Sequence, residues 1–150
     1  MNNAISTNDD LLQFADDLVR LQLQQTLRVL VMVADYPLRK LFQGFFQQRK
    51  VRNLQAFEKG TALIQTMLAS KDKTVVFYDL ETPDKNGLEL LALLKKVPDA
   101  CKNIQVVLVT GQVQNSISEK LLAGGASAIL ARPISQDSMV ECLKTLKLSL

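Results

Sequence analysis

Two carboxylates, a hydroxyl and a guanidinium stand at the ends of four apolar runs of the chain: Asp35, Asp79, Thr110 and Arg132. Two neighbouring carboxylates form a hard-oxygen site of the kind that binds Mg²⁺. A carboxylate can also attack a phosphoryl group as a nucleophile, and a cation and a hydroxyl can then hold the oxygens of the added group. These residue types predict phosphoryl chemistry, provided that the fold brings them together.

The segments before these four residues predict the elements that would position them. Near-continuous apolar runs are typical of strands buried on both faces of a parallel sheet. Such runs, with one weaker alternating segment, lie at 28–34, 51–57, 74–78, 104–109 and 126–131. Segments with helical spacing of apolar residues alternate with them, at 37–46, 61–69, 88–97, 113–123 and 136–148. The order predicts an α/β doubly wound parallel sheet with helices on both faces.

Sites in open parallel sheets form beyond the carboxyl ends of the strands. All four residues fall at such ends, so we expect them to converge at one edge. Each residue alone also has a simpler interpretation: the Asp as a turn or helix cap, the Thr as a strand former and the Arg as a surface charge. The joint occurrence at four strand ends favours a site.

The chain divides by pattern into an extension, 1–27, and a main domain, 28–150. Apolar residues at helical spacing predict a helix over about 9–24, with acids in its first turn. Residues 1–25 carry a net charge of −3, which leaves +6 on the rest of the chain. We expect this acidic helix to dock on a basic area of its own chain or of a dimer mate, although the area is also typical of a solvated face. The basic residues are Arg39, Lys40, Arg49, Lys50 and Arg52.

Composition excludes several classes of function. The 150 residues contain no histidine, which excludes Ser-His-Asp hydrolysis, histidine-ligated metal sites and a phosphohistidine in the same chain. The only cysteines, Cys101 and Cys142, are too far apart in sequence to indicate a disulfide framework or a zinc site. Neither a signal peptide nor a membrane span is indicated, so we expect a cytoplasmic protein. A net charge of +3 without a helix-turn-helix gives no support for direct nucleic-acid binding.

Four sequence blocks resemble the receiver domains of two-component response regulators, in the chemotaxis-regulator-like superfamily, over roughly 28–148. The blocks are Val33-Ala34-Asp35-Tyr36-Pro37-Leu38, Asp79-Leu80-Glu81-Thr82-Pro83-Asp84-Lys85-Asn86-Gly87, Val107-Leu108-Val109-Thr110-Gly111, and Gly125-Ala126 with Arg132-Pro133-Ile134. The resemblance implies a flavodoxin-like sheet with strand order 2-1-3-4-5. It also implies a signalling module rather than a metabolic enzyme.

The resemblance implies a role for each matched residue. Asp79 would be the phospho-acceptor, charged by a partner histidine kinase or phosphotransfer protein. Asp35, Asp79 and the backbone carbonyl of Glu81 would bind Mg²⁺. Thr110 would be the switch hydroxyl that closes on the phosphoryl group, with Arg132 as the adjacent cation. Two structural roles follow as well: Pro133 would follow a cis bond, and Gly87 would start the third helix.

Three positions depart from the family pattern. Ala34 stands where receivers carry a further acid, Arg132 replaces the usual lysine, and Ile129 replaces the usual aromatic switch residue. Losing one acid weakens the Mg²⁺ site. The planar guanidinium keeps the charge of lysine but prefers bidentate pairing, and it can clamp Asp79. Ile129 has no polar tip to relay a switch.

Two hypotheses therefore stay open. The chain is either a working phospho-acceptor, or a pseudo-receiver that keeps the fold as an interaction module without being phosphorylated. A remote third, a flavin-binding doubly wound protein, is disfavoured because the first strand is followed by Asp35-Tyr36-Pro37 rather than a phosphate-binding loop. The resemblance implies a signalling surface made by 113–123, 126–131 and 136–146, facing a downstream output domain or protein, or a second copy in a homodimer.

Overall fold

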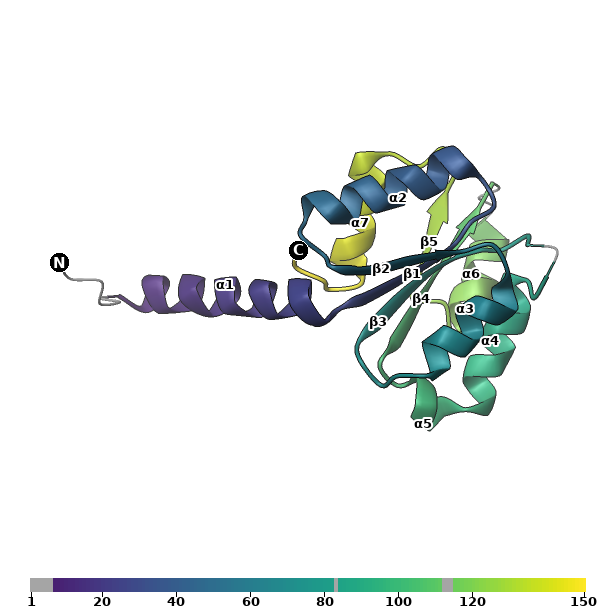
Figure 1. Ribbon diagram of the computed structural model, residues 1–150, viewed down its shortest axis with the longest axis horizontal. Coiled ribbons are helices and arrows are strands. Elements are labelled where there is room, and N and C mark those ends of the chain that lie inside the picture. The colour runs from purple at the N-terminus through teal and green to yellow at the C-terminus, as the bar shows by residue number, and fades with distance from the viewer. Residues whose placement is uncertain (1–6, 83, 112–114) are drawn as a thin grey trace.

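One parallel sheet organises the molecule in the computed structural model, which describes residues 7–82, 84–111 and 115–150 (Figure 1). Its strands are β1 (Arg28–Met32), β2 (Asn53–Phe57), β3 (Thr74–Asp79), β4 (Ile104–Thr110) and β5 (Ala128–Ala131). Their spatial order is β2-β1-β3-β4-β5, and every neighbouring pair is parallel. The predicted doubly wound α/β sheet with order 2-1-3-4-5 is confirmed.

Helices cover both faces of this sheet. The helices in the described part of the chain are α1 (Asn8–Thr26), α2 (Tyr36–Gln48), α3 (Gly60–Leu68), α4 (Gly87–Lys96), α5 (Pro98–Cys101), α6 (Asn115–Ala123) and α7 (Gln136–Thr145). Helices α2 and α7 lie on one face, and α3, α4 and α6 lie on the other (Figure 1). The right-handed crossover that parallel neighbours require accounts for this division.

The apolar strand runs feed two separate cores because successive side chains of a strand point to opposite faces. Val75 and Phe77 of β3 join the core under α2 and α7, whereas Val76 and Tyr78 join the core under α3 and α4. Strands β1 and β4 divide in the same way. All residues of β1 and β3 are buried, which explains why their sequences read as continuous rather than alternating.

Most element boundaries agree with the sequence, and the differences have local causes. The short helix α5 was not predicted; Pro98 stands at its first position, where a proline suits a new helix. Strand β5 begins at Ala128, two residues later than expected, because a turn with Gly125 at φ +114° precedes it. The predicted helix start at Val113 and the motif residue Pro83 lie outside the described residues.

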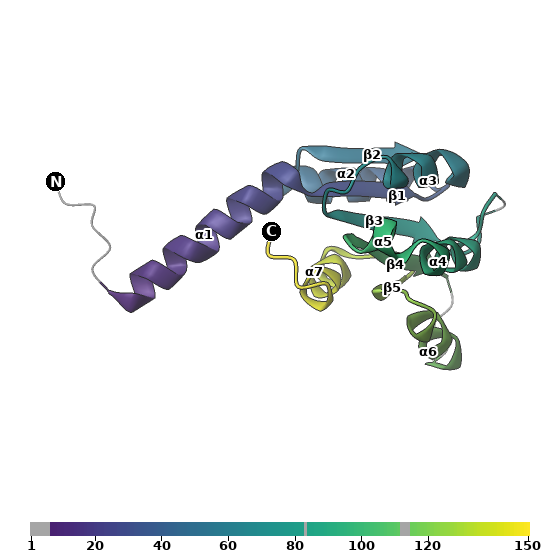
Figure 2. The same cartoon turned by 90° about the horizontal axis from the view of Figure 1, so that it is seen from below.

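Helix α1 projects from the body instead of lying on it (Figures 1 and 2). Thr7 caps it by accepting from the Asp10 backbone N–H, and none of its residues is buried. It does not fold back over its own α2, which carries Arg39, Lys40 and Arg49 in or next to it. Within the described part of the chain, no helix is long and apolar enough to cross a membrane.

A buried arginine closes the amino-terminal edge of the sheet. Arg28, at the start of β1, is 6% exposed, and its Nε donates to Thr74 Oγ1 at 3.0 Å. Its two terminal nitrogens donate to the carbonyls of Thr66 and Met67, both at 2.9 Å. These carbonyls lie in the last turn of α3, where few backbone N–H donors of the helix remain, so Arg28 ties the end of α3 to the sheet.

Candidate functional site

The carboxyl-terminal edge of the sheet brings three of the predicted residues onto adjacent strands. Asp79 is the last residue of β3 and Thr110 the last of β4, while Arg132 directly follows β5. The backbone N–H of Arg132 donates to the Thr110 carbonyl at 2.9 Å, which extends the pairing of β4 with β5 by one residue. The parallel register therefore fixes Arg132 beside Thr110.

Asp79 and Arg132 are joined by an ion pair. Arg132 Nη2 lies 2.8 Å from Asp79 Oδ2, a short charge-assisted hydrogen bond. The other oxygen, Oδ1, accepts from the backbone N–H of Glu81 at 3.1 Å. The Asp79 side chain is 11% exposed and that of Arg132 31% exposed, so the ion pair is partly accessible to solvent and lies outside the core.

Thr110 is buried at 3% exposure, and it lies at the edge that holds the Asp79–Arg132 pair. Its placement at the end of a fully buried stretch of β4 means that its hydroxyl faces a low-dielectric setting, where hydrogen bonds to an anion are strong. The backbone arrangement therefore places Thr110 at the same edge of the sheet as the Asp79–Arg132 ion pair.

Asp35 takes part in the edge as well as capping a helix. It is the N-cap of α2, where Oδ1 accepts from the Leu38 N–H at 3.4 Å, a long bond for a cap. It also lines a shallow groove of about 430 Å³ whose opposite wall is Arg132 and Pro133. Asp35 is therefore a helix cap that lines the same groove as Arg132. The Arg132–Pro133 bond is cis, as the resemblance implied.

The oxygen donors at this edge fit Mg²⁺ in kind, since two carboxylates and the Glu81 carbonyl are hard ligands. Among the described residues, however, no three acidic, cysteine or histidine side chains gather as a metal cluster. Arg132 also lies on Asp79 Oδ2, an oxygen that a cation would compete for. The residues thus suit a weak Mg²⁺ site with at most two direct carboxylates, in keeping with Ala34 in place of a third acid.

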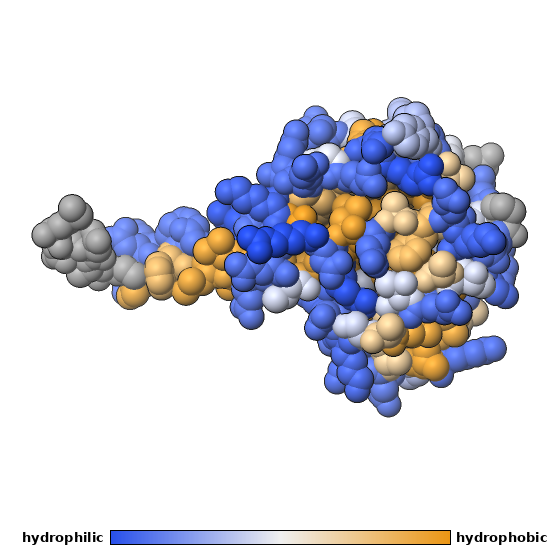
Figure 3. Space-filling view, viewed as in Figure 1, coloured by the Kyte–Doolittle hydropathy of each residue, from blue (hydrophilic) through white to orange (hydrophobic). Residues whose placement is uncertain are grey.

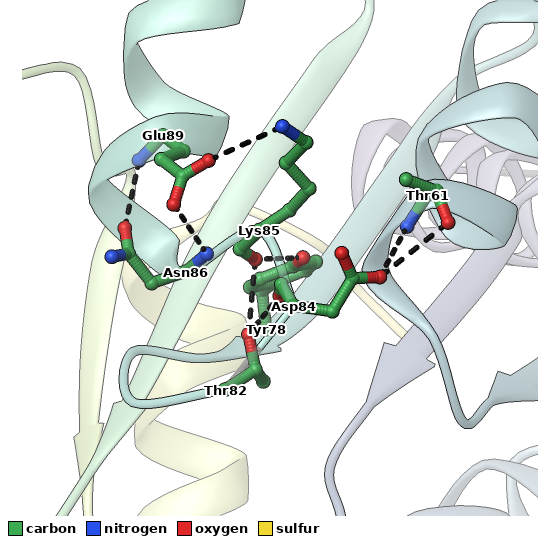
Figure 4. Close-up of polar contacts among 7 residues, drawn as sticks. All are labelled: Thr61, Tyr78, Thr82, Asp84, Lys85, Asn86 and Glu89. Carbon is green, nitrogen blue, oxygen red and sulfur yellow. Dashed lines mark hydrogen bonds and ion pairs between the residues drawn. The ribbon is translucent and has the colours of Figure 1, made fainter.

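The loop that follows Asp79 is fixed by its own polar contacts (Figure 4). Thr82 Oγ1 donates to the carbonyls of Asp84 and Lys85, at 2.7 and 2.9 Å. The buried Tyr78 hydroxyl donates to the Lys85 carbonyl as well. Burial raises the pKa of Tyr78 above its ordinary value, so the hydroxyl keeps the proton that it donates.

This loop also leans on the start of α3. Asp84 Oδ2 accepts from the Thr61 N–H at 3.3 Å (Figure 4). A Cβ at Gly60 would collide with the Tyr78 hydroxyl and lie 3.2 Å from the Asp84 carbonyl oxygen. Position 60 therefore requires a glycine, because the loop after β3 approaches its backbone too closely for a side chain. This role was not predicted from the sequence, because a glycine before a helix indicates only an element boundary.

Helix α4 begins at Gly87, as expected, and has a complete capping box. Asn86 Oδ1 accepts from the Glu89 N–H at 3.0 Å, and Glu89 Oε1 accepts from the Asn86 N–H at 3.4 Å. Lys85 and Glu89 form an exposed ion pair at 3.5 Å (Figure 4). These contacts fix where the loop after Asp79 ends and α4 begins.

The departures from the family pattern lie on exposed or half-buried positions. Ala34 is exposed beside Asp35. Ile129 is half-buried and packs against the core under α3 and α4, and it lines a shallow hollow of about 540 Å³ between α6 and α7. Leu122 of α6 lines the same hollow and is 48% exposed. This hollow lies on the surface where the resemblance implied partner contact.

Comparison with known proteins assigns the fold and the family. A family model described as the response regulator receiver domain matches residues 29–144. The polar-differentiation response regulator DivK of Brucella anthropi is 30% identical over 71 residues, which is 47% of this chain and 57% of that protein. The two-component response regulator-like protein APRR9 of Arabidopsis thaliana is 26% identical over 114 residues, 75% of this chain but 24% of that protein. The matched regions thus span little more than half of the first relative and a quarter of the second.

Solved structures agree with this assignment. The chemotaxis protein CheY4 of Vibrio cholerae superposes with a TM-score of 0.68 at 15% identity, covering 79% of this chain and 97% of that one. At this identity the likeness shows the fold alone. The signal receiver domain of a putative LuxO repressor protein from Vibrio parahaemolyticus gives a TM-score of 0.66 at 25% identity, covering 80% and 92%. Because the family match covers most of the chain and the sheet has the same architecture as these domains, the chain belongs to the response regulator receiver domain family.

Proposed function

We propose that the chain is a working signalling receiver that accepts a phosphoryl group on Asp79. The donor is a partner histidine kinase or phosphotransfer protein, and the phosphorylated state is passed on through protein–protein contacts. The contact between Asp79 and Arg132 at 2.8 Å carries the proposal. It places a cation on a carboxylate at the open edge of the sheet, beside a groove through which a donor can approach.

The chemistry is a single displacement at phosphorus. One Asp79 carboxylate oxygen attacks, a new O–P bond forms, and the bond from phosphorus to the donor's leaving group breaks. The leaving group departs with the bonding electron pair, so the product is an acyl phosphate and no oxidant or reductant is involved. A phosphoryl group on Asp79 would add negative charge next to Arg132.

Arg132 and Thr110 would stabilise that charge. A guanidinium has five N–H donors in a planar fork, so the bond to Oδ2 leaves donors for the oxygens of a second anion. The buried Thr110 hydroxyl sits on the neighbouring strand end, where it would contribute a further donor. Preorganised donors in a partly desolvated edge stabilise developing charge more than water does.

Mg²⁺ is part of this proposal. Asp35, Asp79 and the Glu81 carbonyl would hold it, and it would neutralise charge between the acceptor carboxylate and the incoming phosphoryl group. The chain's own residues do the rest: Asp79 attacks, Glu81 N–H orients Oδ1 at 3.1 Å, and Arg132 holds Oδ2. In this role the chain is a cytoplasmic phosphoprotein of a two-component system, not a metabolic enzyme.

One observation favours a second candidate, an interaction module that is never phosphorylated. The same 2.8 Å ion pair engages the nucleophile before any donor arrives, and Ala34 removes an acid that would draw Mg²⁺ to the edge. In that case the Asp79–Arg132 ion pair would permanently mimic the phosphorylated state of the domain. The partner surface around Ile129 and Leu122 would then act constitutively.

Labelling with a small phosphodonor separates the two candidates. The purified chain is incubated with Mg²⁺ and acetyl phosphate, and its intact mass is measured. Asp79→Asn should remove the added phosphoryl mass, whereas Asp84→Asn, on the same loop, should retain it. A phosphorylated Asp79→Asn variant would rule out Asp79 as the acceptor.

The two departures from the family pattern provide the reciprocal experiment. If the wild-type chain shows no adduct while Ala34→Asp with Arg132→Lys does, the interaction module is the function. If the wild-type chain is labelled, the double variant should be labelled faster, because it gains an acid for Mg²⁺ and loses the guanidinium fork. The two results cannot occur together, so the experiment assigns one function.

A further inference from the structure

Helix α1 carries an apolar surface that its own chain leaves uncovered. Leu11, Phe14, Leu18 and Leu21 are between 50 and 53% exposed, and none of the helix is buried. An orange, apolar band runs along the projecting helix in the space-filling view (Figure 3). Apolar side chains of this size at full helical spacing are normally buried against another element.

The spacing of this stripe is that of a coiled-coil seam. The four residues follow one another at intervals of three, four and three, which are the a and d positions of a heptad, and a further step of four reaches Gln25. The seam is flanked on one side by two further exposed apolar residues, Leu12 and Val19, which are 65 and 58% exposed and occupy b positions. It is also self-complementary, because each residue can meet its own copy.

We propose that α1 pairs with α1 of a second copy of this chain in a parallel two-stranded coiled coil. Parallel pairing sets the two Gln25 amides against each other, where each can donate and accept. It also places Asp10 of one copy near Ala15 of the other, and Asp17 near Gln22, so no like charges meet across the seam.

Charge excludes a lipid surface as the occupant. The polar side of α1 carries Asp9, Asp10, Asp16 and Asp17 against a single Arg20. Helices that lie on membranes carry lysine and arginine on the polar face, and anionic lipids repel an acidic one. An acidic helix with an apolar seam instead suits a protein partner of identical sequence.

The size of the seam fits a dimer of moderate strength. At 1.5 Å per residue, the 19-residue helix is about 28 Å long. Burying four half-exposed large side chains from each copy removes on the order of 1,000 Å² in total, near the lower limit for a specific interface. Where α1 meets the body, Leu21 also lines a hollow of about 420 Å³ with Lys50, which leaves room and a positive charge for a second acidic helix.

Sedimentation equilibrium of the full chain over the micromolar range tests the pairing with two neighbouring substitutions. The wild type should show a monomer–dimer equilibrium, and Leu18→Glu should raise its dissociation constant at least ~10-fold. Val19→Glu is the matched control: Val19 is 58% exposed but off the seam, so the constant should stay within about twofold. Denaturant midpoints should be the same for all three chains at concentrations where the wild type is monomeric, since neither residue belongs to a core cluster.

A cross-linking experiment tests the parallel arrangement. Leu11→Cys should form a disulfide between two copies, and Asp16→Cys, on the opposite side of the helix, should not. The native thiols do not compete: Cys101 and Cys142 are 8 and 5% exposed, and burial raises the pKa of Cys142 to about 12.

Four results would overturn the proposal. The first is a wild-type chain that stays monomeric, and the second is a dimer that Leu18→Glu and Val19→Glu weaken equally. The third is a dimer that is lost in Leu122→Glu but not in Leu18→Glu. The fourth is a dimer that dissociates at high salt but not on the substitution Leu18→Glu. The third would assign the interface to the face around α6, β5 and α7, and the fourth would assign it to the basic residues near α2.

Discussion

The two edges of the sheet each hold an arginine, and the two are bound in different ways. Arg28, at the amino-terminal edge, is 6% exposed and donates to Thr74 Oγ1 and two backbone carbonyls at 2.9 to 3.0 Å. Arg132, at the carboxyl-terminal edge, has a side chain that is 31% exposed and bonds one carboxylate, Asp79, at 2.8 Å. The same residue type thus has a fixed neutral set of partners at one end and a single ionic partner at the other.

The two arginines show that residues that stabilise this fold and residues available for chemistry lie at opposite edges of the sheet. The acceptors of Arg28 include backbone carbonyls at the end of α3, which no reaction alters and which only unfolding releases. The acceptor of Arg132 is a carboxylate that can take up another group, and the exposure of the guanidinium gives it room to follow. Strand starts therefore hold the fold together, and strand ends are where the proposed exchange of partners takes place.

Substitution of Arg28, at the amino-terminal edge, should cause the greatest loss of stability. Arg28→Met should lower the free energy of unfolding by about 3 kcal/mol, because it removes the buried donors to Thr74 Oγ1 and to the Met67 carbonyl. Arg132→Met should change it by less than about 1 kcal/mol, since a partly exposed ion pair contributes little. Urea denaturation of both variants measures the two values. Equal losses would show that the edges do not differ in this way.

A smaller loss of stability is expected where Gly60 approaches the loop after β3. Gly60→Ala should cost about 2 kcal/mol, because its Cβ collides with the Tyr78 hydroxyl that holds the acceptor loop. In a Tyr78→Phe background the same substitution should cost clearly less, since the colliding oxygen is gone. A double-mutant cycle, with the free energies of unfolding measured by denaturation, gives the coupling energy between the two residues. Additive losses would mean that the glycine and the tyrosine act independently.

The smallest effect on stability concerns Asp35. Asp35→Asn keeps a good N-cap, so the free energy of unfolding should change by less than about 0.5 kcal/mol. Phosphorylation of Asp79 should nonetheless need roughly 10-fold more Mg²⁺, because one charged oxygen ligand has become neutral. Labelling across a Mg²⁺ series gives the shift. An unshifted series would remove Asp35 from the proposed metal site and leave it as a cap alone.

The sequence predicted the sheet because its signals are local. Continuous apolar strands alternated with amphipathic helices, and the strand-end rule then selected Asp79, Thr110 and Arg132 as neighbours. Contacts between distant segments were not predictable in this way. Arg28 reads as an ordinary strand start, yet its partners Thr66 and Thr74 lie 38 and 46 residues further along the chain.

The position of α1 relative to the sheet could not be predicted from the local sequence pattern either. Its periodicity indicated a helix correctly, but an apolar stripe at helical spacing does not reveal whether it meets the same chain or another. The roles of Gly60 and Tyr78 depend on how closely α3 approaches the loop after β3. That distance is set by packing, not by any residue preference.

We expect Arg132 to move from Asp79 to the added phosphoryl group, and side-chain NMR of the arginine guanidinium groups can follow this exchange. Spectra are recorded before and after acetyl phosphate and Mg²⁺ are added, with the intact mass of the same sample as a check on labelling. We predict that the Arg132 signals shift in step with the phosphoryl mass, while the buried Arg28 Nε–H, bonded to Thr74, stays unchanged. A labelled chain with unmoved Arg132 signals, or no labelling at all, would contradict the account.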